Sequence, residues 1–281
     1  MKLSPRVRQA VTPLRAIMAI YIVAMLVMMF LAPVLAPYDP IAQNVALRLK
    51  PPLSEGHLLG TDELGRDILS RIMYGAQIEL FIALGATLLA TVLGTLLGLF
   101  GAYFNGVAEF VTMRLVVDVV LAFPPIILAL LAVTLYGPGS VTLIIAIGVL
   151  FAPIFARITY GQVLSVKREE YVDAAKTFGA PTILIMFRTV LPNVSAPIIV
   201  QFSLTMAAAI LLESGLSYLG LGVVPPAPSW GSMVAQGQRY LTSNPHALLV
   251  PGIVVVLTIL AFGILGDALR DLLDPKAKKR S

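Results

Sequence analysis

The chain has 281 residues, of which 58% are hydrophobic and only 12% are charged. A soluble domain has about 25% charged residues, so this composition excludes a soluble globular protein and indicates a polytopic membrane protein. The chain contains no cysteine, which excludes a disulfide framework, a thiolate metal site and a cysteine nucleophile. The net charge of +5 does not indicate nucleic-acid binding, because the basic residues follow a membrane topology.

The first hydrophobic run covers about residues 17–35 and follows Lys2, Arg6, Arg8 and Arg15. The apolar region of a cleaved signal peptide is about 7–15 residues long, and this run is longer. We therefore expect a cytoplasmic N-terminus at 1–16 and an uncleaved first span. A polar segment rich in Pro and Gly follows up to Gly75, so we group 17–75 as the first helix and an extracytoplasmic segment.

Five more hydrophobic runs follow, at about 78–103, 110–136, 141–163, 196–219 and 248–265. A helix needs about 20 residues to cross the hydrocarbon core of a bilayer. The expected fold is an all-α polytopic membrane protein with six transmembrane helices. Its transmembrane domain is expected at 76–275 and a basic cytoplasmic tail at 276–281. Pro124-Pro125 and Pro153 are expected to bend their spans.

The orientation follows from the distribution of Lys and Arg. With the N-terminus inside, fifteen of the 20 basic residues fall on the inner side. The outer side holds only Arg48, Lys50, Arg66, Arg71 and Arg239, together with several acids that include Glu79. Both termini are therefore predicted to be cytoplasmic.

The polar segment at residues 167–193, called here the 167–193 loop, separates two hydrophobic runs on this inner side. Tyr171, Ala174, Ala175 and Phe178 recur at helical spacing and predict an amphipathic helix. Gly179 is expected to end that helix. A second short helix is expected after Pro181 and should stop at Leu191-Pro192.

Asp173-Ala174-Ala175, Gly179 and Leu191-Pro192 together resemble the EAA loop of ABC-importer permeases. Asp173 replaces the usual Glu, and Thr189 replaces an Ile. In that family the loop forms a coupling helix that docks into a groove on a separate ATPase subunit. The resemblance implies ATPase docking by Glu170, Tyr171, Asp173, Ala174, Ala175, Phe178, Gly179, Leu191 and Pro192.

Three further blocks, at 57–75, 217–231 and 266–275, are similar to permeases of the dipeptide/oligopeptide/nickel branch. This similarity implies an importer-type permease in a prokaryotic inner membrane, working by alternating access. Its expected partners are a homologous second permease, two ABC ATPase subunits that bind ATP and Mg, an extracytoplasmic solute-binding protein and the lipid bilayer. Short peptides are the expected substrates, with nickel chelates and glutathione as alternatives.

Two acidic residues lie inside the predicted spans, where charge is costly and usually functional or paired. Asp118 has Arg114 one turn before it, which suggests an i, i+4 ion pair. Glu213 has no basic residue close in sequence. Both are candidates for lining a pathway or for pinning one helix to another.

The sequence contains no G-x4-G-K-[ST] phosphate loop, no H-E-x-x-H motif and no G-x-S-x-G motif. We therefore expect no catalytic residue, metal or cofactor on this chain. Other classes remain open on the residues alone. They are a self-sufficient secondary transporter that couples ions through Asp118 or Glu213, a channel, and an intramembrane enzyme.

Overall fold

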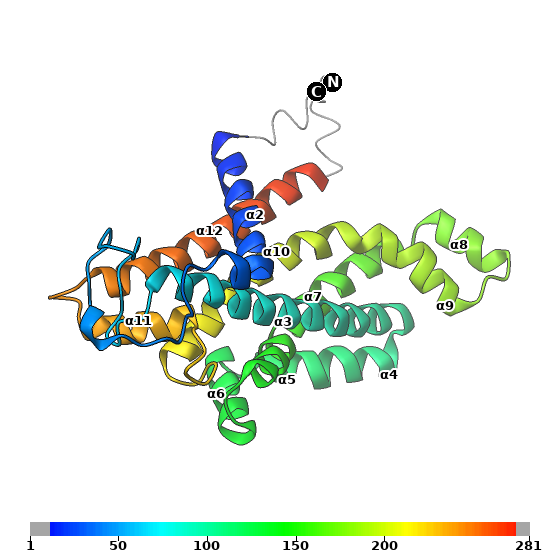
Figure 1. Ribbon diagram of the computed structural model, residues 1–281. Helices are drawn as coiled ribbons and strands as arrows, with labels where there is room; N and C mark the ends of the chain where they lie inside the picture. The colour runs from blue at the N-terminus through cyan, green and yellow to red at the C-terminus, as the bar shows by residue number, and fades with distance from the viewer. Residues whose placement is uncertain (1–11, 274–281) are drawn as a thin grey trace.

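The computed structural model describes residues 12–273; the expected tail at 276–281 and Lys2, Arg6 and Arg8 lie outside the described residues. This part of the chain folds into helices and connecting loops without a β-strand (Figure 1). Five helical segments are long and apolar enough to span a membrane. They are α2 (Pro13–Leu35), α3 (Ile68–Phe104), α7 (Ser140–Val166), the continuous segment Thr182–Tyr218, and α12 (His246–Leu273).

The predicted third span is a bent pair of helices rather than one straight helix. Its first arm joins α4 (Gly106–Glu109), the π-helical segment η2 (Phe110–Val117) and α5 (Asp118–Leu121); its second arm is α6 (Pro125–Tyr136). The arms meet at 89°. Pro124 and Pro125 cause the break, because each lacks an N–H and disfavours helical backbone in the preceding residue. The expected bend at this pair is confirmed, whereas α7 continues through Pro153.

The 167–193 loop contains α8 (Glu170–Thr177) and then α9 (Thr182–Leu184). The predicted stop at Leu191-Pro192 is wrong. The helix runs from α9 through the π-helical segment η3 (Ile185–Val190) into α10 (Leu191–Tyr218). Pro192 lies in the first turn of α10, where its missing N–H is tolerated, and the preceding π-helical turn marks the change in hydrogen bonding.

Helices α3 and α7 pack side by side at very close range (Figure 1). A Cβ atom on Gly94 would lie 2.1 Å from the Ala152 carbonyl oxygen, and one on Gly98 would lie 2.3 Å from that of Ala156. The two glycines, spaced four residues apart, therefore allow backbone-to-backbone contact within the chain.

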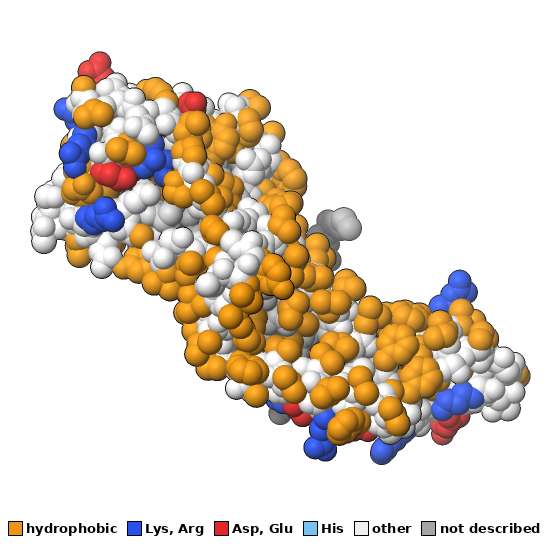
Figure 2. Space-filling view, turned by 90° about the horizontal axis from the view of Figure 1, so that it is seen from below, with side chains coloured by type: hydrophobic (Ala, Val, Ile, Leu, Met, Phe, Trp, Pro, Cys, Tyr) orange, Lys and Arg blue, Asp and Glu red, His pale blue; other side chains and the backbone are white. Residues whose placement is uncertain are grey.

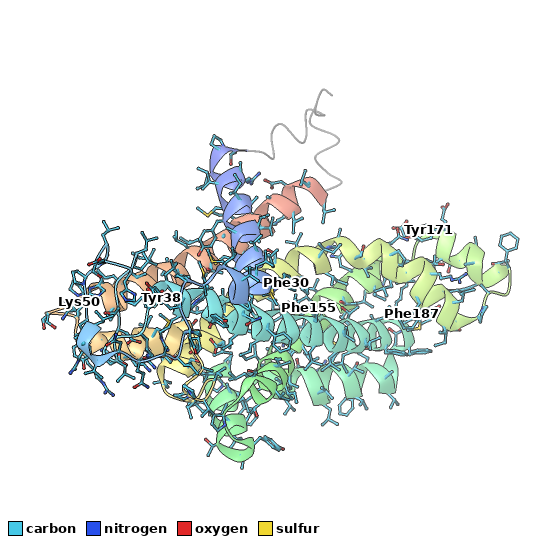
Figure 3. The ribbon with its side chains drawn as sticks, viewed as in Figure 1. Phe30, Tyr38, Lys50, Phe155, Tyr171 and Phe187 are labelled. Carbon is cyan, nitrogen blue, oxygen red and sulfur yellow. The ribbon has the colours of Figure 1, made fainter. Side chains whose placement is uncertain are left out.

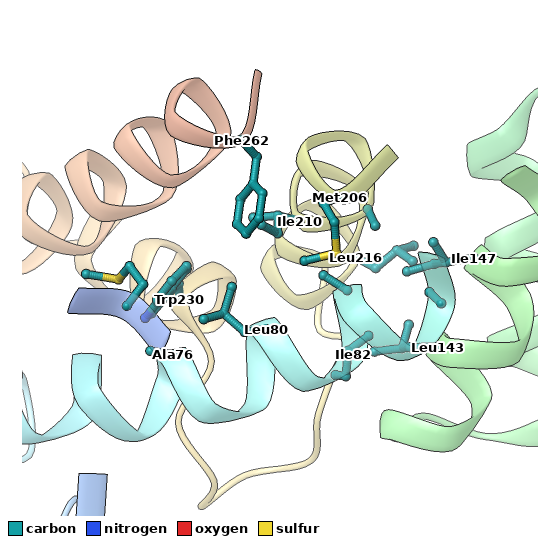
Figure 4. Close-up of a cluster of buried hydrophobic side chains, with 14 of the residues drawn as sticks. Ala76, Leu80, Ile82, Leu143, Ile147, Met206, Ile210, Leu216, Trp230 and Phe262 are labelled. Carbon is teal, nitrogen blue, oxygen red and sulfur yellow. The ribbon is translucent and has the colours of Figure 1, made fainter. Parts of the chain in front are cut away.

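A hydrophobic core joins α2, α3, α7, α10, α12 and the short helix α11 (Trp230–Gln238). Figure 4 shows Trp230 of α11 above α3 near Leu80, and Phe262 of α12 facing Ile210 of α10. The Trp230 indole Nε1–H donates to the Ile72 carbonyl at 3.1 Å. Gly75 makes room for the ring, since a Cβ there would lie 2.7 Å from it. These contacts fix α11 against α3.

The molecule is elongated, with α11 at one end and α8 at the other (Figure 1). The α11 end also holds the segment between α2 and α3, which contains the short helix η1 (Val45–Leu47). Figure 2 shows hydrophobic side chains covering most of the middle, while charged side chains gather toward the ends. This distribution suits a bilayer around the middle of the molecule, with each end in water.

Candidate functional site

The helix α8 protrudes at one end of the molecule, where Figure 3 shows Tyr171 far from Lys50 at the opposite end. Its outward side is unusually apolar for an exposed surface. Tyr171 is 43% exposed and Phe178 is 90% exposed, and Ala174 between them is also exposed. Three of the four residues in the predicted stripe therefore form an open surface, which we call the α8 face: Tyr171, Ala174 and Phe178.

The inner side of α8 is held by Val172, which the sequence reasoning missed. Val172 is completely buried, and Ala175 is partly buried beside it, in a cluster with Ile185 and Met186. Ala175 thus belongs to the inward side and not to the exposed stripe. The i, i+3 spacing of Val172 and Ala175 in the sequence could have indicated that the two residues share one face of the helix.

The end of α8 has the predicted geometry. Gly179 has φ of 75°, which is favourable for glycine and strained for other residues. The Gly179 N–H donates to the Lys176 carbonyl at 2.9 Å, and the Ala180 N–H donates to the Ala175 carbonyl at 3.1 Å. These bonds close the helix as glycine caps commonly do.

The charged residues of α8 are exposed to solvent. Lys176 pairs with Asp173 at 2.8 Å on the open side, and Glu170 lies in the first turn. An acidic residue there interacts favourably with the positive helix end. The remaining candidates, Leu191 and Pro192, lie outside α8, in the first turn of α10. Leu191 packs against the hydrophobic cluster that contains Val172 of α8, Val190 and Val194.

The base of the 167–193 loop is hydrogen-bonded to the end of α3. The Lys167 Nζ donates to the Ala102 carbonyl at 2.5 Å and to the Asn105 Oδ1 at 2.8 Å. Burial lowers the pKa of the Lys167 ammonium, and the neighbouring Arg168 charge lowers it further. The Ala102 carbonyl belongs to the negative end of α3, where a cation is stabilising.

Asp118 does not pair with Arg114, contrary to the sequence prediction. It pairs with Arg157 of α7, at 2.9 Å, and both side chains are about half exposed, at 47% and 58%. The π-helical turns of η2 before Asp118 alter the regular i, i+4 spacing, which removes the basis of the local prediction. The ion pair joins α5 to α7 instead.

Glu213 is fully buried in α10, and its partner is another acid, Glu79 of α3. From the sequence, Glu79 was counted among the acids of the outer side, at the edge of the hydrophobic run 78–103. Helix α3 begins at Ile68, so Glu79 lies well inside it and is also fully buried. The placement of Glu213 favours helix pinning over an exposed position in a pathway.

At the α11 end, Asp62 and Glu63 are paired with arginines, and Asp67 is paired with His57 at 2.9 Å. Arg66 contacts Asp62 at 2.6 Å and Glu63 at 3.2 Å, and Arg71 contacts Asp62 at 3.4 Å. No group of three or more His, Cys, Asp or Glu residues suited to a metal occurs in residues 12–273.

The comparisons with known proteins agree with this arrangement. A family model described as "Binding-protein-dependent transport system inner membrane component" matches residues 90–279. The di/tripeptide transport system permease protein of Pseudomonas aeruginosa is 42% identical over 88% of this chain and 83% of the relative. The glutathione transport system permease protein of Pectobacterium atrosepticum is 38% identical over 92% of this chain and 86% of the relative.

Among solved structures, an inward-facing MetNI methionine ABC transporter has a similar fold. The TM-score is 0.58 at 17% sequence identity, and the match covers 73% of this chain and 96% of that chain. At this identity the likeness concerns the fold.

Proposed function

The chain belongs to the family of binding-protein-dependent transport system inner membrane components and is an ABC-importer permease; we propose that it imports short peptides. The observation that carries this substrate is the identity of about 40%, over most of the chain, to permeases named for di/tripeptides and dipeptides. Glutathione is itself a small peptide, and a glutathione permease is nearly as similar. Nickel chelates remain the alternative cargo of the same machinery.

In this proposal the α8 face docks on a separate ATPase subunit. Tyr171, Ala174 and Phe178 are neighbours on one side of α8 and together form a continuous exposed apolar patch. Patches of this kind commonly mark protein contacts, whereas isolated exposed apolar residues do not. Ala174 has a small side chain, which allows a partner to approach the helix backbone. Val172 and Gly179 serve this surface indirectly, because one anchors α8 and the other ends it.

The proposed mechanism is alternating access driven by partner subunits. ATP and Mg bind to the ATPase pair, whose closure moves α8. The permease then opens outward to receive a peptide from the extracytoplasmic solute-binding protein, and hydrolysis resets it. Nucleotide and peptide must bind the two conformations with different free energies for this coupling to exist.

We place the Asp118–Arg157 pair on the side of the molecule that faces the second permease and the pathway. Both side chains are about half exposed, although they lie next to long apolar runs in α6 and α7. Charged groups in spans avoid lipid and face a bundle interior or water.

We also assign the α8 end and both termini to the cytoplasm, since most Lys and Arg residues lie on that side.

Uptake into proteoliposomes tests this function. The chain would be reconstituted with its second permease and ATPases, and binding protein with a labelled dipeptide would be added outside. We expect uptake that requires ATP inside and is lost in Gly179→Asp, while membrane insertion persists. Uptake driven by an ion gradient without ATP would instead establish a secondary transporter, and preference for a nickel chelate would replace the peptide assignment.

A further inference from the structure

Two buried carboxyl groups face each other between α3 and α10. Glu79 and Glu213 are both completely buried, and they are neighbours because Ser214, the residue after Glu213, donates its hydroxyl to Glu79. One oxygen of each has a serine donor. The Ser214 hydroxyl donates to Glu79 Oε1, and the Ser217 hydroxyl donates to Glu213 Oε1 at 2.7 Å. The second oxygen, Oε2, of each glutamate has no donor in the described part of the chain.

The surroundings stabilise one negative charge at most. Trp230 is the first residue of α11 and its backbone N–H lies near the Glu79 carboxyl, so the positive end of this helix is close to the pair. Apart from Glu213, no other charged residue acts on Glu79 among the groups described. Arg71 lies about two helical turns away on α3 and is already bonded to Asp62 and to the Pro40 carbonyl. Helix α11 itself carries no charged residue.

Two ionised carboxylates cannot form a hydrogen bond with each other, because both are acceptors only. Burial of two like charges in contact is also strongly unfavourable. A single proton removes both problems, since it neutralises one group and supplies the missing donor. We propose that Glu79 and Glu213 together bind one shared proton and form a hydrogen-bonded carboxylic acid–carboxylate pair that fastens α3, α10 and α11.

The shared proton makes separation of α3 and α10 at the α11 end dependent on pH. A conformation that admits water between α3 and α10 at this depth solvates both carboxylates and releases the proton. The closed pair binds one proton more than the opened pair, so opening here becomes more favourable as pH rises. The proton site is the same whichever substrate the importer carries.

Infrared difference spectroscopy of the assembled importer in lipid tests the proton directly at neutral pH. We expect a carbonyl-stretch band of a protonated carboxylic acid in the wild type that is lost in Glu79→Gln and in Glu213→Gln. A matched control, Glu55→Gln, removes an exposed carboxylate and should leave the band unchanged. A wild type without the band, or a band that survives both glutamine substitutions, overturns the proposal.

A second measurement covers the case in which a variant fails to assemble. Carbon-13 glutamate incorporated only into this subunit should shift the wild-type band, and the absence of a shift overturns the proposal. Assembled Glu213→Gln should also lose the pH dependence that the proton gives to peptide uptake. An unchanged pH profile in that variant contradicts the link between the proton and opening, while retained ATP-driven uptake leaves the importer function standing.

Discussion

Lys167 offers a test of how movement of α8 reaches the transmembrane helices. Its ammonium joins the base of the 167–193 loop to the end of α3 through the Ala102 carbonyl and the Asn105 side chain, at 2.5 and 2.8 Å. Lys167→Met removes both bonds and keeps a side chain of similar length. We expect the importer to assemble and hydrolyse ATP, because the α8 face and its anchor Val172 are untouched.

The expected loss of coupling in Lys167→Met can be estimated from the two hydrogen bonds that the substitution removes. A hydrogen bond to a charged group contributes about 1.5–3 kcal/mol when buried. Lys167 is only partly buried, so we take about 1.5 kcal/mol for both bonds together, which corresponds to about a tenfold change in an equilibrium constant. Peptide uptake per ATP hydrolysed should therefore fall by about tenfold.

The assay measures ATP hydrolysis and labelled-peptide uptake in the same proteoliposomes. Arg168→Met is the matched control, since it removes an adjacent basic residue whose side chain is exposed. Lys167→Arg should restore most of the coupling, because a guanidinium can reach the same carbonyl. An uptake-to-hydrolysis ratio in Lys167→Met equal to that of Arg168→Met would refute the role of this contact.

Three further predictions concern the docking surface, the helix contact and the ion pair. Ala174→Trp should abolish binding of the ATPase subunits in pull-down assays while membrane insertion stays normal, and retained binding would contradict docking through the α8 face. Gly98→Ala should destabilise the permease by about 1–3 kcal/mol through overpacking against α7. Thermal unfolding in detergent measures this, with Gly161→Ala as control because a Cβ there meets nothing within 4 Å. Asp118→Arg should reduce peptide uptake, and adding Arg157→Asp should recover it if the pair mainly joins α5 to α7; lack of recovery would favour direct contact with the pathway.

The elements that sequence predicts well are those governed by local rules. Hydrophobic runs of spanning length identified every long helix, and Gly179 ended α8 where a left-handed residue was required. The pair Pro124-Pro125 marked a real break because proline acts on its own neighbours in the chain. The predicted helix stop at Pro192 was wrong because proline is tolerated in the first turn of a helix, and the local sequence does not show that Pro192 falls in the first turn of α10.

The partners of the buried and ionised groups could not be predicted from sequence. Asp118 had a plausible partner one turn away, yet its actual partner lies on α7 and is brought close by packing between helices. Glu79 lies at the margin of a hydrophobic run, so its burial depends on α3 starting at Ile68 and on α10 covering it. Long-range contacts of this kind have no local sequence signal.

Helix α3 connects the two regions on which the proposals depend. Lys167 binds the carbonyl of Ala102 near one end of α3, and Glu79 contacts Glu213 about 35 Å away along the same helix. A continuous helix that packs closely on α7 through Gly94 and Gly98 can carry a displacement over that distance with little bending. Helix α10 offers a second route, because it continues from α9 and carries Glu213 near its other end.

Spin labels can separate these two routes, and the absence of cysteine allows specific labelling. One distance would be measured across the α11 end, from Leu58→Cys of this chain to a label on the second permease, with and without ATP. If α3 carries the movement, Lys167→Met reduces the ATP-dependent change in this distance, while a label on Thr177→Cys, an exposed residue outside the α8 face, still reports movement of α8. An undiminished change across the α11 end would assign transmission to α10, and the Lys167 contact would then only stabilise the loop.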